Sequence, residues 1–188
     1  MPTTLYYDTE TTKILQKNAP IEEQPHIVQL AAILIDDDLG EIASINVIVK
    51  PDGWEVPEEA AQVHGITTEK AEKFGIPLIV ALASFSNLCK VSDLLVAHNN
   101  YFDLGVLGFE YERLGKPNIM KEKNHFCTMN ATTDLCRIPG KFGKYKWPKL
   151  IEAHEMLLGE TFDGAHDALV DVRACYRVHK YLIENNLV

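Results

Sequence analysis

Two carboxylates stand inside an apolar, strand-like run near the start of the chain, and they constrain its fold more than any other feature. The run from Leu5 to Thr12 contains Asp8 and Glu10. On a β-strand, residues two apart point to the same face, which puts these acids roughly 6.6 Å apart at the usual strand rise. Two anions that close in a partly buried site repel each other and raise each other's pKa, and a divalent cation removes the conflict. The simpler alternative is an exposed strand end whose acids face water.

Two further segments supply carboxylates. An apolar stretch from 94 to 98 leads into Asp103, in the first turn of a predicted helix, and Asp171 follows in a second helix near the C-terminus. An acid in a first turn is stabilised by the helix dipole by roughly 0.3–1 kcal/mol, which is the alternative for Asp103. A loop between strand and helix is, however, where α/β sheets place their ligands. We therefore expect Asp103 to join Asp8 and Glu10.

Asp171 lies on the core-facing stripe of its helix. It is spaced i, i+4, i+7 and i+11 with Cys175, Val178 and Leu182. A carboxylate on such a stripe must be paired or bound, and we favour a metal ligand over a structural ion pair because no cation lies next to it on the stripe.

His166 precedes Asp171 by five residues, a spacing that turns two side chains apart within one continuous helix. We expect the histidine to precede the helix, with Asp167 as its N-cap. With an ordinary pKa near 6.5, an imidazole there can accept a proton at neutral pH. A solvated loop histidine is the alternative.

The bulk properties narrow the class of protein. A chain of 188 residues is expected to form one domain over residues 1–188. Its longest apolar stretches fall short of the roughly 18 residues of a membrane span, so we expect no membrane contact. Four scattered cysteines indicate reduced thiols and a cytoplasmic location. The net charge of −9 argues against a protein that coats nucleic acid through its overall field, but not against a nuclease.

The order of the predicted strands and helices indicates a mixed central β-sheet with helices on both faces, whereas their periodicity alone predicts only an α/β fold. Three strands in a meander come first, and later strands are separated by helices. The predicted strands cover residues 4–10, 27–35, 41–50 and 94–98, with a hairpin turn at 36–40. The predicted helices cover residues 58–63, 67–73, 77–90, 100–114, 129–137, 148–157 and 168–184.

Three motifs in this order resemble the DEDDh 3′-to-5′ exonucleases. They are D-x-E at 8–10, H-N-x-x-F-D at 98–103 and H-x-x-x-x-D at 166–171, and V-H-G-I-T at 63–67 adds a fourth similarity. The type member of that family is the proofreading epsilon subunit of bacterial DNA polymerase III. The resemblance spans residues 5 to 180 and implies an RNase H-like fold.

The same resemblance implies a two-metal site with magnesium or manganese. Asp8 would bridge both ions, Glu10 and Asp171 would complete the site that activates water, and Asp103 would hold the second ion. Hard cations prefer oxygen ligands, which carboxylates supply. Two ions stabilise the attacking and leaving oxygens of a phosphodiester. His166 would be the general base.

Contacts to the terminal nucleotide are expected from positions within the motifs. These are Thr9, Thr11, Val63, His64, Asn99 and Phe102. For His64 the alternative is an ordinary histidine at a helix end. His98 is expected to hydrogen-bond structurally with Asn99. Lys13 departs from the glycine that the family often has there, where the backbone normally touches the terminal nucleotide, and it opens an insertion-like segment, the 13–25 loop.

The segment from Lys141 to Lys149, the lysine–aromatic segment, alternates lysines with rings. Lys141, Lys144 and Lys146 are expected on phosphates of a single strand, with rings on bases. The alternative is a solvated basic loop in which Trp147 packs before a helix that starts at Pro148.

We therefore predict a metal-dependent 3′-to-5′ exonuclease that hydrolyses single-stranded DNA ends to nucleoside 5′-monophosphates. RNA trimming of the exoribonuclease or oligoribonuclease type is the close alternative, because the same motifs serve both. A polymerase-accessory subunit without turnover is disfavoured, since a pure binder needs no four converging carboxylates. A DNA polymerase is a candidate partner by the same resemblance.

Overall fold

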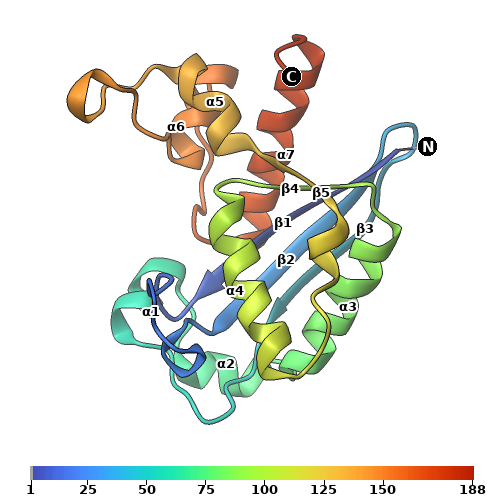
Figure 1. Cartoon of the computed structure of the whole chain (residues 1–188), viewed down its shortest axis with the longest axis vertical. Coiled ribbons are helices and arrows are strands. Elements are labelled where there is room, and N and C mark those ends of the chain that lie inside the picture. Colours follow the sequence, from blue (N-terminus) through green and yellow to red (C-terminus); the bar gives the residue numbers. More distant parts are fainter. Residues whose placement is uncertain (1) are drawn as a thin grey trace.

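A five-stranded mixed sheet forms the centre of the computed structural model, which describes residues 2–188 (Figure 1). The strand order is β3-β2-β1-β4-β5. β1 (Thr3–Thr11) pairs antiparallel with β2 (Ile27–Asp36), and β2 pairs antiparallel with β3 (Gly40–Ile48). β4 (Leu94–Ala97) runs parallel to β1, and β5 (Asn124–Cys127) runs parallel to β4. The predicted mixed sheet is confirmed. β5 was not among the predicted strands, because half of this four-residue strand is exposed and its pattern is not apolar.

Seven α-helices accompany the sheet in residues 2–188, each within two residues of its predicted bounds. They are α1 (Glu58–His64), α2 (Thr68–Phe74), α3 (Leu78–Val91), α4 (Asn100–Arg113), α5 (Thr128–Cys136), α6 (Leu150–Leu158) and α7 (Ala168–Glu184). Short 3-10 turns lie at Ile21–Glu23, Ile119–Glu122 and Lys141–Gly143. None of the α-helices is both long and apolar enough to cross a bilayer, over the residues described.

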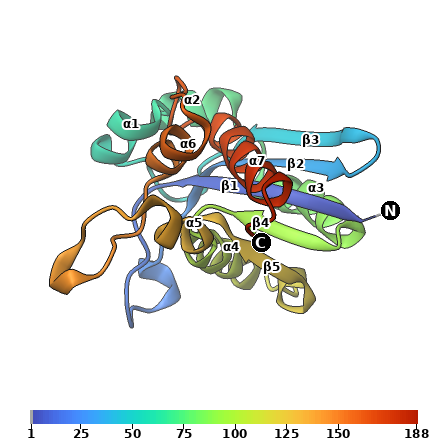
Figure 2. The same cartoon turned by 90° about the horizontal axis from the view of Figure 1, so that it is seen from above.

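The alternation of β1 sends its side chains to two different cores. Leu5 and Tyr7 pack with Phe85 of α3 and Leu107 of α4 on one face of the sheet. Tyr6 packs on the other face with residues of α7, where Val172 and Cys175 are buried. Figure 2 shows α7 on the near side of the sheet and α3 and α4 behind it. Because the period of a strand is two, Asp8 and Glu10 share the Tyr6 face, beneath α7.

The register of the parallel strands decides which segments meet Asp8. Tyr6 pairs with Val96, so Asp8 stands beyond the end of β4, where the chain turns into α4. The carboxyl end of β1, the first turn of α4 and the first turn of α7 therefore meet at one edge of the sheet. In open α/β sheets this is the usual place for a ligand.

Candidate active site

The two acids of β1 lie partly buried under α7 and repel their neighbours. Burial first, and then the charges of Asp171, Asp103 and Asp167, raise the pKa of Glu10 to about 8. Burial and the same kind of repulsion hold the pKa of Asp8 well above its usual range. The charges that act on both groups are all carboxylates. No positively charged side chain is therefore among the groups that act on these two acids and could balance their charge.

Asp103 faces this cluster from the first turn of α4 and is 2% exposed. Its Oδ1 atom accepts hydrogen bonds from the backbone N–H of Thr9, at 3.0 Å, and from the Thr9 hydroxyl, at 2.8 Å. Burial raises the pKa of Asp103 to about 7, although both hydrogen bonds oppose that shift. Thr9, expected to contact substrate, thus fixes one oxygen of Asp103 and leaves the other to the cluster.

Asp171 lies in the first turn of α7 and is hydrogen-bonded to the loop that precedes this helix. Its Oδ2 atom accepts the backbone N–H of His166 at 2.9 Å. Burial raises the pKa of Asp171, and the His166 N–H opposes the shift. Possible ligand atoms of Glu10, His166 and Asp171 all lie within 4.8 Å of one another. The nearby Arg173 pairs instead with Glu41, at 3.4 Å, so Arg173 does not serve as the ion-pair partner of Asp171.

His166 precedes α7, as its spacing from Asp171 predicts. The residue is exposed and has a positive φ of 71°. Asp167 is the N-cap, because its carboxylate accepts from the backbone N–H groups of Leu169 and Val170. Gly164, with a φ of 81°, supports the same tight approach. The loop therefore presents an imidazole beside two of the acids without adding it to the helix.

The structure places the predicted contacts to a terminal nucleotide in three settings. His64 is the last residue of α1, and its Nδ1 accepts a hydrogen bond from the backbone N–H of Ile66, at 3.2 Å. Its Nε2 is buried beside the backbone of Thr11 and makes no hydrogen bond of normal geometry among residues 2–188. Burial lowers the pKa of His64, and the nearby His166 adds to the shift. Val63 is 54% exposed. The Thr11 hydroxyl donates to the carbonyl of Lys13 and begins the 13–25 loop.

Asn99 and Phe102 lie at the start of α4. Asn99 is the residue before the helix and has left-handed backbone angles, which asparagine tolerates better than most residues. Phe102 is partly buried and packs on the core between the sheet and α4. Both are close in sequence to Asp103, but their side chains are not joined to the acids by any hydrogen bond in residues 2–188.

The expected pairing of His98 with Asn99 is wrong. His98 shares a hydrogen bond with the Thr128 hydroxyl, at 2.9 Å, and its Nε2 donates to the carbonyl of Pro148, at 3.0 Å. Burial lowers the pKa of His98 to about 4. The role is structural, as predicted, but it ties the end of β4 to α5 and to the approach to α6. Partners so far along the chain carry no local sequence signal.

The lysine–aromatic segment is only in part a free basic surface. Lys141 and Lys144 are exposed, and Phe142 between them is 98% exposed. Lys146 instead pairs with Glu152 at 2.7 Å. Trp147 is 68% exposed and does not serve as a packed staple, and α6 begins at Leu150, two residues after the predicted start. Figure 1 shows this segment projecting from the body of the molecule before α6.

The comparisons with known proteins extend over nearly the same residues. A family model described as exonuclease, of the RNase T type, matches residues 5–179. The DNA polymerase III subunit epsilon of Buchnera aphidicola (subsp. Acyrthosiphon pisum) is 35% identical over 173 residues, which cover 89% of this chain and 67% of that protein. An uncharacterized exonuclease of Escherichia phage 186 is 28% identical over 183 residues, covering 90% of this chain and 82% of that protein.

Solved structures of exonuclease I share the fold. E. coli exonuclease I in complex with a dA16 oligonucleotide superimposes with a TM-score of 0.77 at 21% identity. The match covers 100% of this chain and 42% of that one, so this chain spans about two fifths of exonuclease I. A zinc-bound form of the E. coli enzyme with single-stranded DNA gives a TM-score of 0.76 at 21% identity, over 98% of this chain and 41% of that one. From the family match, the relatives and the RNase H-like sheet together, it follows that the chain belongs to the exonuclease family, in its DEDDh 3′-to-5′ branch.

Proposed function

We propose that this protein removes nucleoside 5′-monophosphates from the 3′ ends of single-stranded DNA, with two bound divalent ions. The observation that carries the proposal is the convergence of Asp8, Glu10, Asp103 and Asp171 at one edge of the sheet, with His166 beside two of them. The match to the exonuclease family over residues 5–179 supports treating residues 1–188 as a single exonuclease domain.

The four acids fit hard cations and are the residues that would hold them. They offer oxygen ligands only, and burial and mutual repulsion raise their pKa values. Magnesium and manganese prefer such ligands. When bound, these ions stabilise the charge on the attacking and leaving oxygens of the phosphodiester. The charges of the other three acids all act on Asp8, which is our candidate for the ligand that both ions share.

His166 supplies the base. Its imidazole is exposed and lies next to Glu10 and Asp171, while its backbone N–H is fixed by the Asp171 carboxylate. It accepts a proton from water as the water oxygen bonds to phosphorus, and the bond between phosphorus and the upstream 3′ oxygen breaks. That 3′ oxygen gains a proton from solvent. The products are a nucleoside 5′-monophosphate and a strand shorter by one nucleotide.

The terminal nucleotide contacts the residues around Thr11. The Nε2 of His64 is buried beside the Thr11 backbone, Val63 next to it is exposed, and Asn99 and Phe102 precede Asp103 at the start of α4. Thr9 acts on the substrate only through Asp103. Lys141 and Lys144 contact phosphates farther along the strand, and Lys146 supports them by pairing with Glu152.

DNA is the favoured substrate because the names of several relatives refer to DNA and several of the similar structures contain it. The epsilon subunits are named for DNA polymerase III, and the exonuclease I structures hold DNA oligonucleotides. A DNA polymerase is accordingly the partner that we propose. RNA trimming remains the second candidate, since the four acids would serve RNA equally well. A subunit without turnover is disfavoured, because a protein that only binds has no need for four acids that repel one another or for an imidazole beside them.

One digestion separates these possibilities. Purified protein with magnesium is incubated with 5′-labelled single-stranded DNA, duplex DNA and short RNA, and the products are resolved by length. We expect a ladder that shortens from the 3′ end, fastest on single-stranded DNA. Asp8→Asn should abolish the ladder, whereas Asp134→Asn, at an exposed acid of α5, should not change it. Ordinary turnover by a folded Asp8→Asn protein would rule out the metal assignment.

A further inference from the structure

The 13–25 loop is held in one conformation by hydrogen bonds and forms a wall beside α4; it is not a loose insertion. Its two ends are closed by hydrogen bonds of 3.0 Å between Thr12 and His26, one from each backbone N–H. Inside the loop, the Gln24 side chain donates to the carbonyls of Gln16 and Ala19, at 2.8 and 3.0 Å, and accepts the Gln16 N–H. These bonds fix a segment that has little regular secondary structure of its own.

Two charged residues of α4, neither of them singled out from the sequence, fasten the loop to the helix. The Arg113 guanidinium donates to the carbonyls of Ile21, Gln24 and Pro25, at 2.8 to 2.9 Å. Glu110 is 1% exposed, lies 3.1 Å from Arg113, and accepts the N–H of Ile27 at 2.9 Å. The available sequence signal was their i, i+3 spacing, with Glu110 on the same helix face as the apolar Val106 and Leu107. Because three carbonyls converge on one guanidinium, the loop keeps one position relative to α4.

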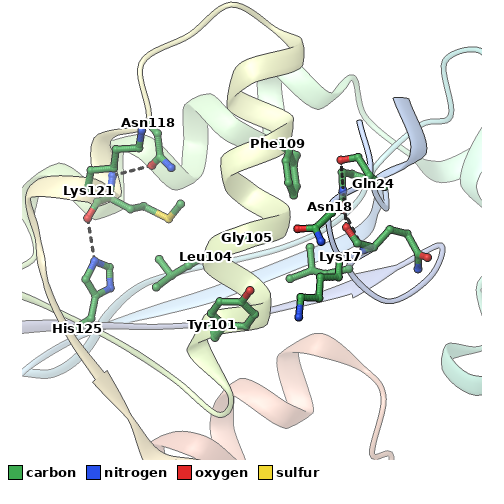
Figure 3. Close-up of a pocket in the computed structure, with 14 residues that line it drawn as sticks. Lys17, Asn18, Gln24, Tyr101, Leu104, Gly105, Phe109, Asn118, Lys121 and His125 are labelled. Carbon is green, nitrogen blue, oxygen red and sulfur yellow. Dashed lines mark hydrogen bonds between the residues drawn. The ribbon is translucent and has the colours of Figure 1, made fainter. Parts of the chain in front are cut away.

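A groove of about 850 Å³ lies over the outer face of α4, with this wall on one side and Asn118, Lys121 and His125 on the other (Figure 3). At its floor, Leu15 of the loop sits directly over Gly105, where an added Cβ would come within 2.8 Å of Leu15 Cδ1. An alanine at position 105 would therefore require the Leu15 side chain to shift. A second hollow of about 610 Å³ continues along α4 and shares Leu104, Gly105, Phe109, Asn118 and Lys121 with the first.

The groove is basic and aromatic in a chain whose net charge is −9. Lys17 and Lys121 line its first part, and Lys116 and Lys121 line its continuation, against the single acid Glu112. Tyr101 is 79% exposed at its mouth. Figure 3 shows Tyr101 and Lys17 toward the same end of the groove, with Lys121 toward the opposite end. Lysines beside an exposed ring and an apolar floor suit phosphates and bases of a single strand.

The groove also begins where the candidate active site ends. Its loop wall follows directly from Glu10 and Thr11 of β1. Its helix wall starts in the first turn of α4, where Tyr101 lines the groove and Asp103 turns inward to the acids. On a helix, residues two apart point to nearly opposite sides, so one turn serves both surfaces. A strand that ends at the acids can therefore continue past Tyr101.

We propose that this groove binds the stretch of single strand upstream of the 3′ end, with a base stacked on Tyr101 and phosphates on Lys17 and Lys121. This inference rests on the proposed function and deepens it, since it makes the protein prefer strands of several nucleotides over dinucleotides. The 13–25 loop becomes a specificity element, because it forms one wall.

The test is a binding measurement that does not depend on turnover. Anisotropy of 5′-labelled dT12 is followed with calcium in place of magnesium. Tyr101→Ala should weaken binding by roughly 5- to 100-fold, as expected when one base stack is removed, and Tyr101→Phe should retain most of the affinity. Lys17→Ala with Lys121→Ala should reduce the slope of log affinity against log salt by roughly 0.7 for each phosphate that is no longer bound. Lys180→Ala, on the exposed side of α7, is the matched control and should change neither quantity.

A length series separates this inference from the proposed function. For the wild-type protein kcat/KM should rise from dT2 to dT12, and Tyr101→Ala should remove most of that rise. Hydrolysis of the p-nitrophenyl ester of thymidine 5′-monophosphate by the wild type tests the acids alone; its failure would contradict the proposed function and not the groove. Unchanged dT12 affinity in Tyr101→Ala and in the double lysine variant would overturn the groove proposal and leave that surface to a protein segment.

Discussion

At the scale of single residues, Glu10 shows the effect of gathering several carboxylates at one partly buried site. Its pKa rises from an ordinary 4.5 to about 8, through burial and through Asp171, Asp103 and Asp167. In the metal-free folded protein it therefore holds a proton that the unfolded chain has already released above pH 4.5. By linkage, the stability of the folded state falls as pH rises through this window.

This shift gives a pH prediction with a definite window. His98 and His179 act in the opposite direction, because burial lowers their pKa values from 6.5 to about 4 and their effect is complete above pH 6.5. Between pH 6.5 and about 8 the carboxylates dominate. The melting temperature in EDTA should fall across that range by a few degrees, and Glu10→Gln should flatten the fall. An identical dependence of melting temperature on pH for the wild type and Glu10→Gln would show that the pKa of Glu10 is not raised in the metal-free protein.

His166 can be assigned by separating proton transfer from metal binding. Loss of a general base slows hydrolysis by roughly 10²–10⁴, so we expect that decrease in kcat for His166→Ala. Metal affinity measured by calorimetry should stay nearly unchanged, because four carboxylates remain. Lys180→Ala, at an exposed residue of α7 outside the cluster and the groove, is the control. A collapse of metal affinity would make His166 a ligand, which its position within 4.8 Å of Glu10 and Asp171 also permits.

At the scale of elements, the lysine–aromatic segment divides into a tip and a base. Lys141 and Lys144 are exposed beside Phe142, whereas Lys146 at the base pairs with Glu152, which also accepts the backbone N–H of Lys149. The tip is therefore available to a strand, and the base holds the start of α6.

The two parts should respond differently to mutation. Lys141→Ala with Lys144→Ala should weaken binding of single-stranded DNA and flatten its salt dependence by roughly 0.7 for each phosphate that the variant no longer binds. Turnover at saturating substrate should change little, because such contacts position the strand away from the reacting bond. Lys146→Ala should change the salt dependence less than the pair does. A salt slope that is unaltered in the double variant would return the segment to a basic surface loop.

At the scale of the whole molecule, the acids come from elements on both faces of the sheet. Asp8 and Glu10 belong to β1, Asp103 to α4 on one face, and Asp171 to α7 on the other. Ions bound among them would tie both layers to the sheet. Because binding to the folded state alone stabilises it, by about 2.7 kcal/mol at a concentration 100 times Kd, metal should raise the stability of the entire fold.

Metal removal tests that coupling. Magnesium or manganese should raise the melting temperature of EDTA-treated protein by several degrees, and the rise should be lost in Asp8→Asn. Without metal, Asp8→Asn should melt at the same temperature as the wild type or higher, since it relieves the repulsion around Asp8. A wild-type melting temperature that does not respond to either metal would argue against a cation among these acids.

Much of this architecture follows from local pattern. Alternation in residues 3–11 determined that Asp8 and Glu10 share a face, and the spacing of Asp171 from Cys175 and Val178 determined that it points toward the core. Caps and helix bounds followed in the same way, as at Asp167 before α7. These features depend on periods of two and 3.6 residues, which a sequence carries within a few positions.

Only the tertiary structure decided which distant groups meet. His98 hydrogen-bonds to Thr128 and Pro148, Asp103 accepts from Thr9, and Arg113 fastens the 13–25 loop to α4. The tertiary structure also placed Leu15 over Gly105 and so formed the groove along α4. Contacts between residues tens of positions apart depend on strand register and helix packing, which no short stretch of sequence encodes. The sequence by itself determined the acids and the faces they occupy, whereas the surface that would receive a strand exists only because two segments far apart in the chain are held against each other.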